Sequence, residues 1–325
     1  MDNICHTLVG AAMGQAGLKR KTPLGMATLM IGANLPDVDA ITYFVSDSST
    51  TLGFRRGWTH GILAMAVWPF VLAAAMMAFD RYVRRRGKRR EREPAQWKPL
   101  LLLSAIGVVS HPFLDFLNTY GVRFLMPFSS KWFYGDTLFI VDLFLWGMLG
   151  LGVFLSRRRE ADALPNPSRP ARTALWGCGI YVLGMFLAGQ QARPVVEREA
   201  LEAGIVVTRK MVAPIPIDPL RKIAVVDTGT DYRSGLFAWV PYPSVEFDPR
   251  IEPKNDRDPA AIAAGQTTEG RRFLSWARFP VYRIERRANE TLVHLADARY
   301  PGRRGSWARV TVRLPASSAA TGAAR

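Results

Sequence analysis

Cysteine is scarce in this chain of 325 residues, which has two cysteines, and only four of its residues are histidine. Two cysteines are too few for a disulfide framework, and Cys5 and Cys178 lie in apolar runs without the spacing of a metal motif. The first residues include Asp2 and lack a basic segment, so we expect no cleavable signal peptide. No internal repeat is visible. These absences exclude a disulfide-stapled domain and a repeat array.

Acidic residues are also few, 27 against 43 lysines and arginines, which gives a formal net charge of +16. Much of the positive charge lies in clusters at 19–21, 81–92 and 157–172. Such clusters are typical of proteins that bind nucleic acid or anionic lipid, and equally of membrane proteins whose basic loops stay in the cytoplasm. Composition alone leaves both interpretations open.

Apolar residues make up 49% of the chain and are concentrated before Gln190. The candidate membrane spans are 62–79, 99–117, 138–155 and 173–188. Two earlier apolar runs, 4–18 and 24–35, are shorter, and the first either crosses the membrane or folds into the bundle. We predict a mainly α, polytopic membrane helical bundle of four or five spanning helices over residues 1–191.

From Ala192 onward, charged residues and strand-like alternation replace the long apolar runs. The expected strands lie at 204–208, 222–227, 236–240, 272–283, 291–295 and 308–314. This alternation, with turn residues between the runs, predicts a small antiparallel β-rich domain over residues 192–316. We expect residues 317–325 to be a disordered tail.

The basic clusters also predict an orientation in the membrane. If all three clusters face the cytoplasm, the spans between them must alternate in direction. His6, His60 and His111 then fall at the outer face, together with the acidic pair Asp37 and Asp39. We therefore expect a multi-pass protein of the bacterial inner membrane, with these residues and the β-rich domain on the extracytoplasmic side.

His111 and Asp115 lie four residues apart at the end of an apolar run, so on a helix their side chains share one face. An imidazole and a carboxylate one turn apart form half of a divalent-metal site. The alternative is a helix-end histidine beside an aspartate that caps the helix or is solvated. The full ligand set predicted at this face is His6, Asp39, His60, His111 and Asp115. This donor set is of the kind that binds zinc or a similar first-row metal.

Asp37 and Asp39 are two residues apart and do not share a helix face, so we expect unequal roles. Because both follow Pro36, one can cap or begin a helix while the other binds the metal, and we favour Asp39 as the ligand. Either aspartate is a candidate to accept a proton from water. Arg55 or Arg56 is a candidate for holding a phosphate, although arginines in such a loop often only face solvent.

Further polar residues are expected around the ligands. Asn118 lies one turn beyond Asp115, and Asp142 sits near the outer end of an apolar run, where an unpaired carboxylate is expensive. With Asp136, these side chains are expected to support the metal ligands through hydrogen bonds.

Five short segments resemble the YdjM/YbcI family of membrane-bound, metal-dependent hydrolases. The segments are Asp2-Asn3 to His6-Thr7, Leu35-Pro-Asp-Val-Asp39, Arg56-Gly-Trp-Thr-His60, His111-Pro-Phe-Leu-Asp115 and Tyr134-Gly-Asp136. The order His, Asp, His, His-x-x-x-Asp is also similar to zinc-dependent phospholipase C, a helical bundle whose metal cluster cleaves phosphoesters. That resemblance implies that Asp115 bridges two ions. The later His and Glu ligands of the phospholipase pattern have no match here, which favours one or two ions.

The sequence thus predicts a membrane-bound hydrolase that uses a metal-activated water on a phosphoester or phospholipid. Asp37, Asp39 and Arg56 are its candidate catalytic residues, and a divalent metal such as zinc is the expected cofactor. One alternative is a non-catalytic membrane protein whose metal is structural or transported. A second is binding of anionic lipid or nucleic acid by the arginine clusters, which is less favoured because topology already explains them. Oligomeric state is left open.

Overall fold

The computed structural model describes residues 1–87, 93–300 and 308–316. The described chain divides into two compact units, each treated below by itself. The first comprises residues 1–39 and 56–188, and the second comprises residues 40–55 and 189–325. The predicted tail at 317–325 and part of the basic cluster at 81–92 lie outside the described residues.

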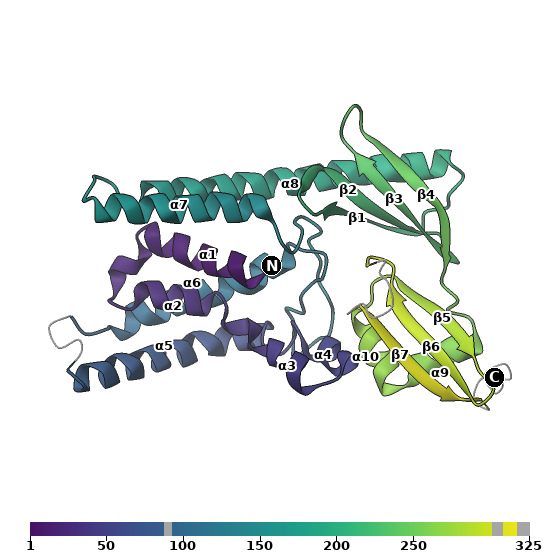
Figure 1. Ribbon diagram of the computed structural model, residues 1–325, viewed down its shortest axis with the longest axis horizontal. Coiled ribbons are helices and arrows are strands. Elements are labelled where there is room, and N and C mark those ends of the chain that lie inside the picture. Colours follow the sequence, from purple (N-terminus) through teal and green to yellow (C-terminus); the bar gives the residue numbers. More distant parts are fainter. Residues whose placement is uncertain (88–92, 301–307, 317–325) are drawn as a thin grey trace. The chain divides into compact units, whose positions relative to one another are not determined.

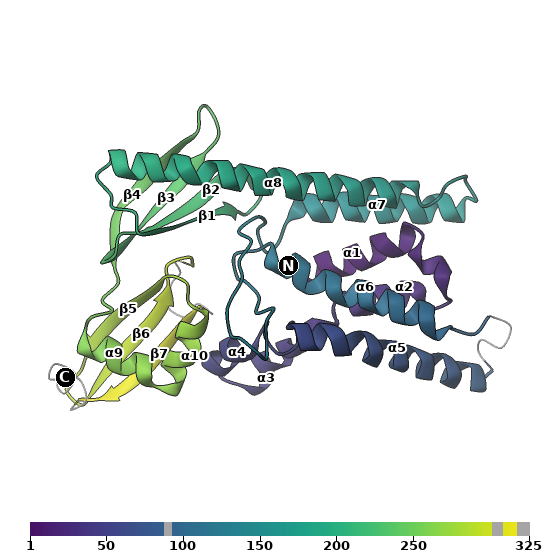
Figure 2. The same ribbon diagram turned by 180° about the vertical axis from the view of Figure 1, so that it is seen from behind.

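The first unit is helical and runs through α1 (Asn3–Gln15), η1 (Leu18–Lys21), α2 (Gly25–Gly32), α5 (Ile62–Arg85), α6 (Trp97–Phe116) and α7 (Leu143–Ala161). The first half of α8 (Arg169–Glu202) completes it. Helix α2 packs on α1 and α6, α5 packs on α6, and α1 packs on α7, so these helices run side by side (Figures 1 and 2). The predicted helical bundle is therefore present.

Three helices of the described chain are long and apolar enough to cross a membrane, namely α5, α6 and α8. They correspond to the spans expected at 62–79, 99–117 and 173–188. Helix α7 covers most of the span expected at 138–155 but is not among the three, and it begins only at Leu143, where Asp142 caps it. Helix α1 has 13 residues, too few to span a bilayer.

Glycines bring α1, α2 and α6 close together near the polar end of the unit. A Cβ added at Gly10 of α1 would lie 2.8 Å from the carbonyl oxygen of Leu29 in α2. A Cβ added at Gly107 of α6 would lie 2.9 Å from the same oxygen and 3.1 Å from Gly32 Cα. Any larger side chain at Gly107 would push α2 and α6 apart. This close crossing places the residues that follow α2 beside the end of α6.

The second unit begins with a four-stranded antiparallel sheet in the order β1-β2-β3-β4. Its strands are β1 (Arg209–Ile215), β2 (Asp218–Asp227), β3 (Asp231–Ala238) and β4 (Ser244–Pro253). One face packs on the end of α8, where Ala192, Val196 and Ala200 meet Val212 and Phe237 (Figure 1). The predicted β-rich domain is confirmed as a sheet structure, although β1 begins after the expected strand at 204–208 and β4 was not foreseen.

A second sheet follows, with strand order β5-β6-β7 for β5 (Pro280–Arg286), β6 (Glu290–Asp297) and β7 (Arg309–Pro315). The strand predicted at 272–283 is wrong over its first half. Residues there belong to α10 (Thr268–Trp276), which follows α9 (Pro259–Gln266). Asp258 and Thr267 accept hydrogen bonds from the first turns of these helices, so both helix starts are capped.

Residues 40–55 pack with the second unit rather than with the helices that flank them in sequence. They contain α3 (Thr42–Val45) and α4 (Ser48–Phe54), and α4 packs on α10. Arg272 of α10 donates a hydrogen bond to Thr50 Oγ1 at 2.7 Å. Just before this segment, the 3₁₀ helix η2 (Leu35–Ile41) carries Asp37 and Asp39.

Candidate metal centre

Four side chains bring their ligand atoms together at one end of the helical unit. One ligand atom from each of Asp37, His60, His111 and Asp115 lies within 4.8 Å of the other three. The two histidine Nε2 atoms are 3.1 Å apart. Asp115 Oδ2 lies 3.4 Å from His60 Nε2 and 3.6 Å from His111 Nε2, and Asp37 Oδ1 lies 3.8 and 3.7 Å from the same two atoms. We call these four side chains the Asp–His cluster.

The separations in the Asp–His cluster match those of a metal coordination shell. Nitrogen and oxygen ligands bound 2.0–2.2 Å from a tetrahedral ion lie roughly 3.3–3.6 Å from one another. The separations of the His–His and Asp–His pairs, 3.1–3.8 Å, bracket that range. Two imidazoles with two carboxylates are also a donor set that zinc and similar first-row metals accept.

A backbone contact at the α2–α6 crossing fixes the orientation of His111. Its Nδ1 lies 2.7 Å from the carbonyl oxygen of Ala33, the residue that follows α2. A carbonyl oxygen only accepts hydrogen bonds, so Nδ1 carries the proton and donates it. The Nε2 atom is then the one turned toward the other cluster members.

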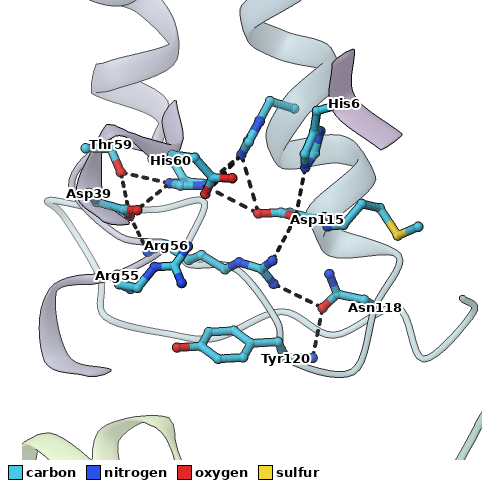
Figure 3. Close-up of polar contacts among 12 residues, drawn as sticks. His6, Asp39, Arg55, Arg56, Thr59, His60, Asp115, Asn118 and Tyr120 are labelled. Carbon is cyan, nitrogen blue, oxygen red and sulfur yellow. Dashed lines mark hydrogen bonds and ion pairs between the residues drawn. The ribbon is translucent and has the colours of Figure 1, made fainter. Parts of the chain in front are cut away.

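Thr59 and Asp39 orient His60 in the same way (Figure 3). Thr59 Oγ1 lies 2.9 Å from Asp39 Oδ2 and 2.8 Å from His60 Nδ1. Because a hydroxyl has one proton and a carboxylate only accepts, Thr59 donates to Asp39 and accepts the Nδ1–H of His60. Burial lowers the pKa of His60, which favours the neutral ring. Its Nε2 lone pair therefore points into the cluster.

These two orientations turn both Nε2 atoms toward the same point of the cluster. Two nitrogen lone pairs 3.1 Å apart repel each other unless a proton or a metal ion lies between them. Asp115 Oδ2 is also buried without a hydrogen-bond donor among the described residues. An orphaned carboxylate oxygen facing two imidazole nitrogens is the arrangement expected of residues that bind a metal ion.

The other oxygen of Asp115 is held by Arg56. The Arg56 guanidinium donates to Asp115 Oδ1 at 2.9 Å and to Asn118 Oδ1 at 3.1 Å, and it lies over the ring of Tyr120 (Figure 3). The amino group of Met1 also contacts Asp115 Oδ1. Arg56 is buried, and its guanidinium contacts the oxygen of Asp115 that is not the one nearest His60 and His111. The sequence predicted a phosphate-binding arginine here, whereas the structure places Arg56 against a carboxylate.

Asp37 and Asp39 occupy different positions, and the structure places Asp37 rather than the favoured Asp39 in the Asp–His cluster. Asp37 belongs to the Asp–His cluster, whereas Asp39 accepts hydrogen bonds from Thr59 and from the Arg56 backbone N–H, the latter at 2.9 Å. Burial alone would raise the pKa of Asp37, but the neighbouring His111 lowers it below its usual range. Asp37 is 8% exposed and the three other members are 0% exposed, so Asp37 marks the solvent edge of the cluster.

His6 lies next to the cluster without being one of its four members. Its ring stacks on His111 with centroids 3.8 Å apart, and its Nε2 lies 3.4 Å from Asp115 Oδ1. Burial lowers the pKa of His6 to about 3, so the ring is neutral near pH 7. Its Nδ1 has no hydrogen-bond partner among the described residues.

The other residues that the sequence predicted for the site are not members of the Asp–His cluster. Asn118 supports Arg56, as described above. Asp142 caps α7 through Phe144 N and Leu145 N, and Tyr181 donates to it at 3.0 Å, so its contacts stabilise helix ends. Asp136 is buried with a φ of 49°. Arg55 donates to Tyr43 within the second unit. Thr59 and the Ala33 carbonyl were not foreseen, although the position of Thr59 directly before His60 was a signal.

Comparison with known proteins agrees with this architecture. Residues 1–192 match the family model described as YdjM inner membrane protein. The chain belongs to this family. A curated relative, the uncharacterized protein YfhP of Bacillus subtilis (strain 168), is 27% identical over 142 residues, which cover 41% of this chain and 39% of YfhP. The chain thus matches less than half the length of that relative. No solved structure matches the chain.

The family match covers the whole Asp–His cluster together with α1, α5, α6 and α7. The description of the family places its members in an inner membrane, in agreement with the three membrane-length helices. The β-sheets of the second unit lie beyond the matched region.

Proposed function

We propose that this YdjM family member is a membrane-bound, metal-dependent hydrolase that cleaves a phosphoester. The observation that carries the proposal is the convergence of four ligand atoms from Asp37, His60, His111 and Asp115 within 4.8 Å. No hydrophobic or structural need of the helices explains two imidazoles and two carboxylates buried at one point, because each isolated charge there is costly.

The residues would hold one divalent ion, with zinc as the expected metal. The donors are two imidazole nitrogens and two carboxylate oxygens, which zinc and neighbouring first-row metals bind. A second ion would need Asp115 Oδ1 and His6. Since Oδ1 already accepts from Arg56, a single ion is favoured. When bound, such an ion lowers the pKa of a water molecule and polarises a phosphoryl oxygen.

The surrounding residues have distinct tasks in this proposal. Asp37 lies at the solvent edge and is placed to receive a proton from water. Asp39 acts through Thr59 and His60, whose Nε2 it keeps directed at the cluster. Arg56 and Asn118 keep Asp115 in place rather than binding substrate. Asp37 is thus the catalytic candidate, and Asp39 and Arg56 are positioning residues.

The proposed substrate is a lipid phosphoester. The cluster lies at one end of α5 and α6, two of the membrane-length helices, so a head group at the membrane surface is within reach. The distribution of basic residues supports the extracytoplasmic side for this end and for the β-rich unit. The same distribution supports a multi-pass arrangement.

Metal content tests the proposal first. We expect about one zinc or manganese ion per chain in detergent-purified protein, and loss of the metal in His111→Ala and Asp115→Ala with the fold retained. His294→Ala is the matched control, because this fourth histidine lies on β6 and bonds Thr311 at 2.9 Å. Absence of metal in wild type, even after zinc is added back without chelators, would overturn the proposal. If the wild-type protein holds the metal, hydrolysis of phosphodiesters and phospholipids by the metal-loaded protein is measured next.

A second candidate is a non-catalytic membrane protein whose metal is structural or transported. The observation that favours it is the complete burial of His60, His111 and Asp115. A structural site has a closed shell, whereas a catalytic one keeps a position for water. Metal-loaded protein that hydrolyses none of the phosphoesters, and whose metal spectrum is unchanged by added phosphate, would favour this candidate.

A further inference from the structure

We propose that the helical unit binds an anionic membrane phospholipid in a groove separate from the Asp–His cluster. The groove lies between α1, α2 and α7 and has a volume of about 700 Å³. The proposal does not depend on hydrolase activity. It follows from an apolar wall, a basic end and a length that fits an acyl chain.

The wall of the groove is apolar and made by three helices. Leu8 and Ala11 lie one turn apart on α1, Met26 and Met30 line it from α2, and Val153 lines it from α7. Helices α1 and α7 run side by side in the same unit (Figures 1 and 2). Hydrocarbon fills the space along this apolar wall at no cost in lost hydrogen bonds, whereas water against the wall itself would lack polar partners.

Basic residues gather at one end of this groove. Lys19 and Arg157 line it, and Arg172 donates to the carbonyl oxygen of Ala16 at the end of α1 at 2.8 Å. Lys19 pairs with Glu160, the one acidic residue lining the groove. Arg157 is exposed and makes no ion pair within the described ranges. Two cations against one carboxylate in the lining leave a net positive end that complements a lipid phosphate.

The length of the groove also fits a lipid tail. Its lining extends along α1 from Thr7 to Gln15, a stretch of nine residues that rises about 13 Å, and continues to Lys19. One leaflet of a bilayer core is about 15 Å thick, half of the roughly 30 Å hydrocarbon core. The phosphate would therefore bind a helix length from His6, so this lipid is a bound partner and not the proposed substrate.

Lipid binding by the full-length protein tests the inference. Detergent-solubilised protein is incubated with equal amounts of phosphatidylglycerol and phosphatidylcholine, and bound lipid is measured by native mass spectrometry. We expect preferential binding of phosphatidylglycerol in wild type. Lys19→Gln with Arg157→Gln should weaken it about fivefold for each charge removed.

The matched control is Lys21→Gln with Arg158→Gln, which removes the same charge from neighbours that do not line the groove. This control should bind phosphatidylglycerol within about twofold of wild type. Equal loss in both double variants, or equal binding of the two lipids by wild type, would overturn the inference.

A groove-filling variant tests the acyl-chain position independently. Ala11→Trp keeps all charges and should abolish phosphatidylglycerol binding, because the indole occupies the space of the chain. Unchanged elution on size exclusion and an unchanged melting temperature would show that this variant folds. A folded Ala11→Trp protein that binds phosphatidylglycerol like wild type would overturn the proposed binding mode.

Discussion

Thr59 fixes the orientation of the His60 ring, although it is not a member of the Asp–His cluster. Its single hydroxyl proton goes to Asp39, so its lone pair receives the His60 proton and fixes which ring nitrogen faces the cluster. An alanine at this position would leave His60 free to present either nitrogen. Carboxylate–histidine pairs of this kind commonly set the affinity of a metal site without touching the metal.

Asp39→Asn tests this arrangement. The amide oxygen can still accept from Thr59 and from the Arg56 N–H, but the negative charge 3.5 Å from His60 Nδ1 is lost. We expect metal affinity to fall about 10–100-fold while binding remains measurable. Titration of the metal-free protein with zinc measures this change. Asp37→Asn, which alters a cluster member, should cause the larger loss, and the reverse ranking would contradict the assignment of these two residues.

The sequence could identify most of the cluster residues but could not rank Asp37 and Asp39. His60, His111 and Asp115 stand out, as does the adjacent His6, because polar residues at the ends of apolar runs are rare and costly. The choice between the aspartates depends on the 3₁₀ turn of η2 and on donors from Thr59 and Arg56, about twenty residues further along the chain. Such tertiary hydrogen bonds leave no periodic signal in a sequence.

At the scale of elements, the crossing of α2 and α6 links helix packing to the orientation of His111 in the Asp–His cluster. Gly107 lets the two helices approach, and Ala33, directly after α2, supplies the carbonyl that orients His111 at 2.7 Å. A change in the spacing of these helices would therefore move an acceptor away from His111. Packing and metal binding should respond together to one substitution.

Gly107→Ala tests that link. The added methyl would lie 2.9 Å from Leu29 O and 3.2 Å from Ala33 N, so we expect a loss of about 1–3 kcal/mol in stability together with weaker metal binding. Thermal unfolding and zinc titration measure the two effects. Gly150→Ala in α7 is the control, because a Cβ there meets nothing within 4 Å. Lower stability with unchanged zinc affinity would contradict the expected link between helix packing and metal binding.

The expected strand at 272–283 was wrong over its first half because local capping signals outweighed the apparent alternation. Asp258-Pro259 places a cap and a proline where a helix begins, and Thr267 caps the next helix with Glu269 in its first turn. These signals were present in the sequence. By contrast, the packing of residues 40–55 with the second unit depends on contacts with α10, some 220 residues away in sequence, for which no local pattern exists.

A buried ion pair makes the second sheet sensitive to acid. Asp297 of β6 accepts from the Arg299 guanidinium at 2.9 and 3.0 Å. Burial alone would raise the pKa of Asp297, but Arg299 and backbone N–H groups lower it. Because the folded-state pKa lies below the unfolded value of about 3.9, this contribution is full above that pH and is lost as pH falls through the folded pKa.

Asp297→Asn should therefore lower the stability of the second unit by about 3–5 kcal/mol at pH 7, since Arg299 stays buried without its counter-charge. Hydrogen exchange of β5 to β7 at pH 7 and pH 3 measures the effect. The difference between variant and wild type should shrink at pH 3. A difference that grows on acidification would contradict the ion-pair explanation.

At the scale of the whole molecule, the orientation in the membrane is open to direct labelling. Both native cysteines are buried, so a cysteine introduced at an exposed position reports its own side. We expect Lys131→Cys, in the segment between α6 and α7, to react with a membrane-impermeant maleimide in intact cells. Lys21→Cys should react only after lysis. The opposite labelling pattern would place the cluster on the cytoplasmic side.

The separation of the cluster residues along the chain also sets the order in which the site can form. Asp37 and His60 are synthesised before α6, and His111 and Asp115 follow only with the end of that helix. When the ribosome has completed α5, only two of the four cluster residues have been synthesised. The four ligand atoms therefore cannot yet come together. For the proposed metal site, we therefore expect loading only after α6 has been synthesised and has packed against α2.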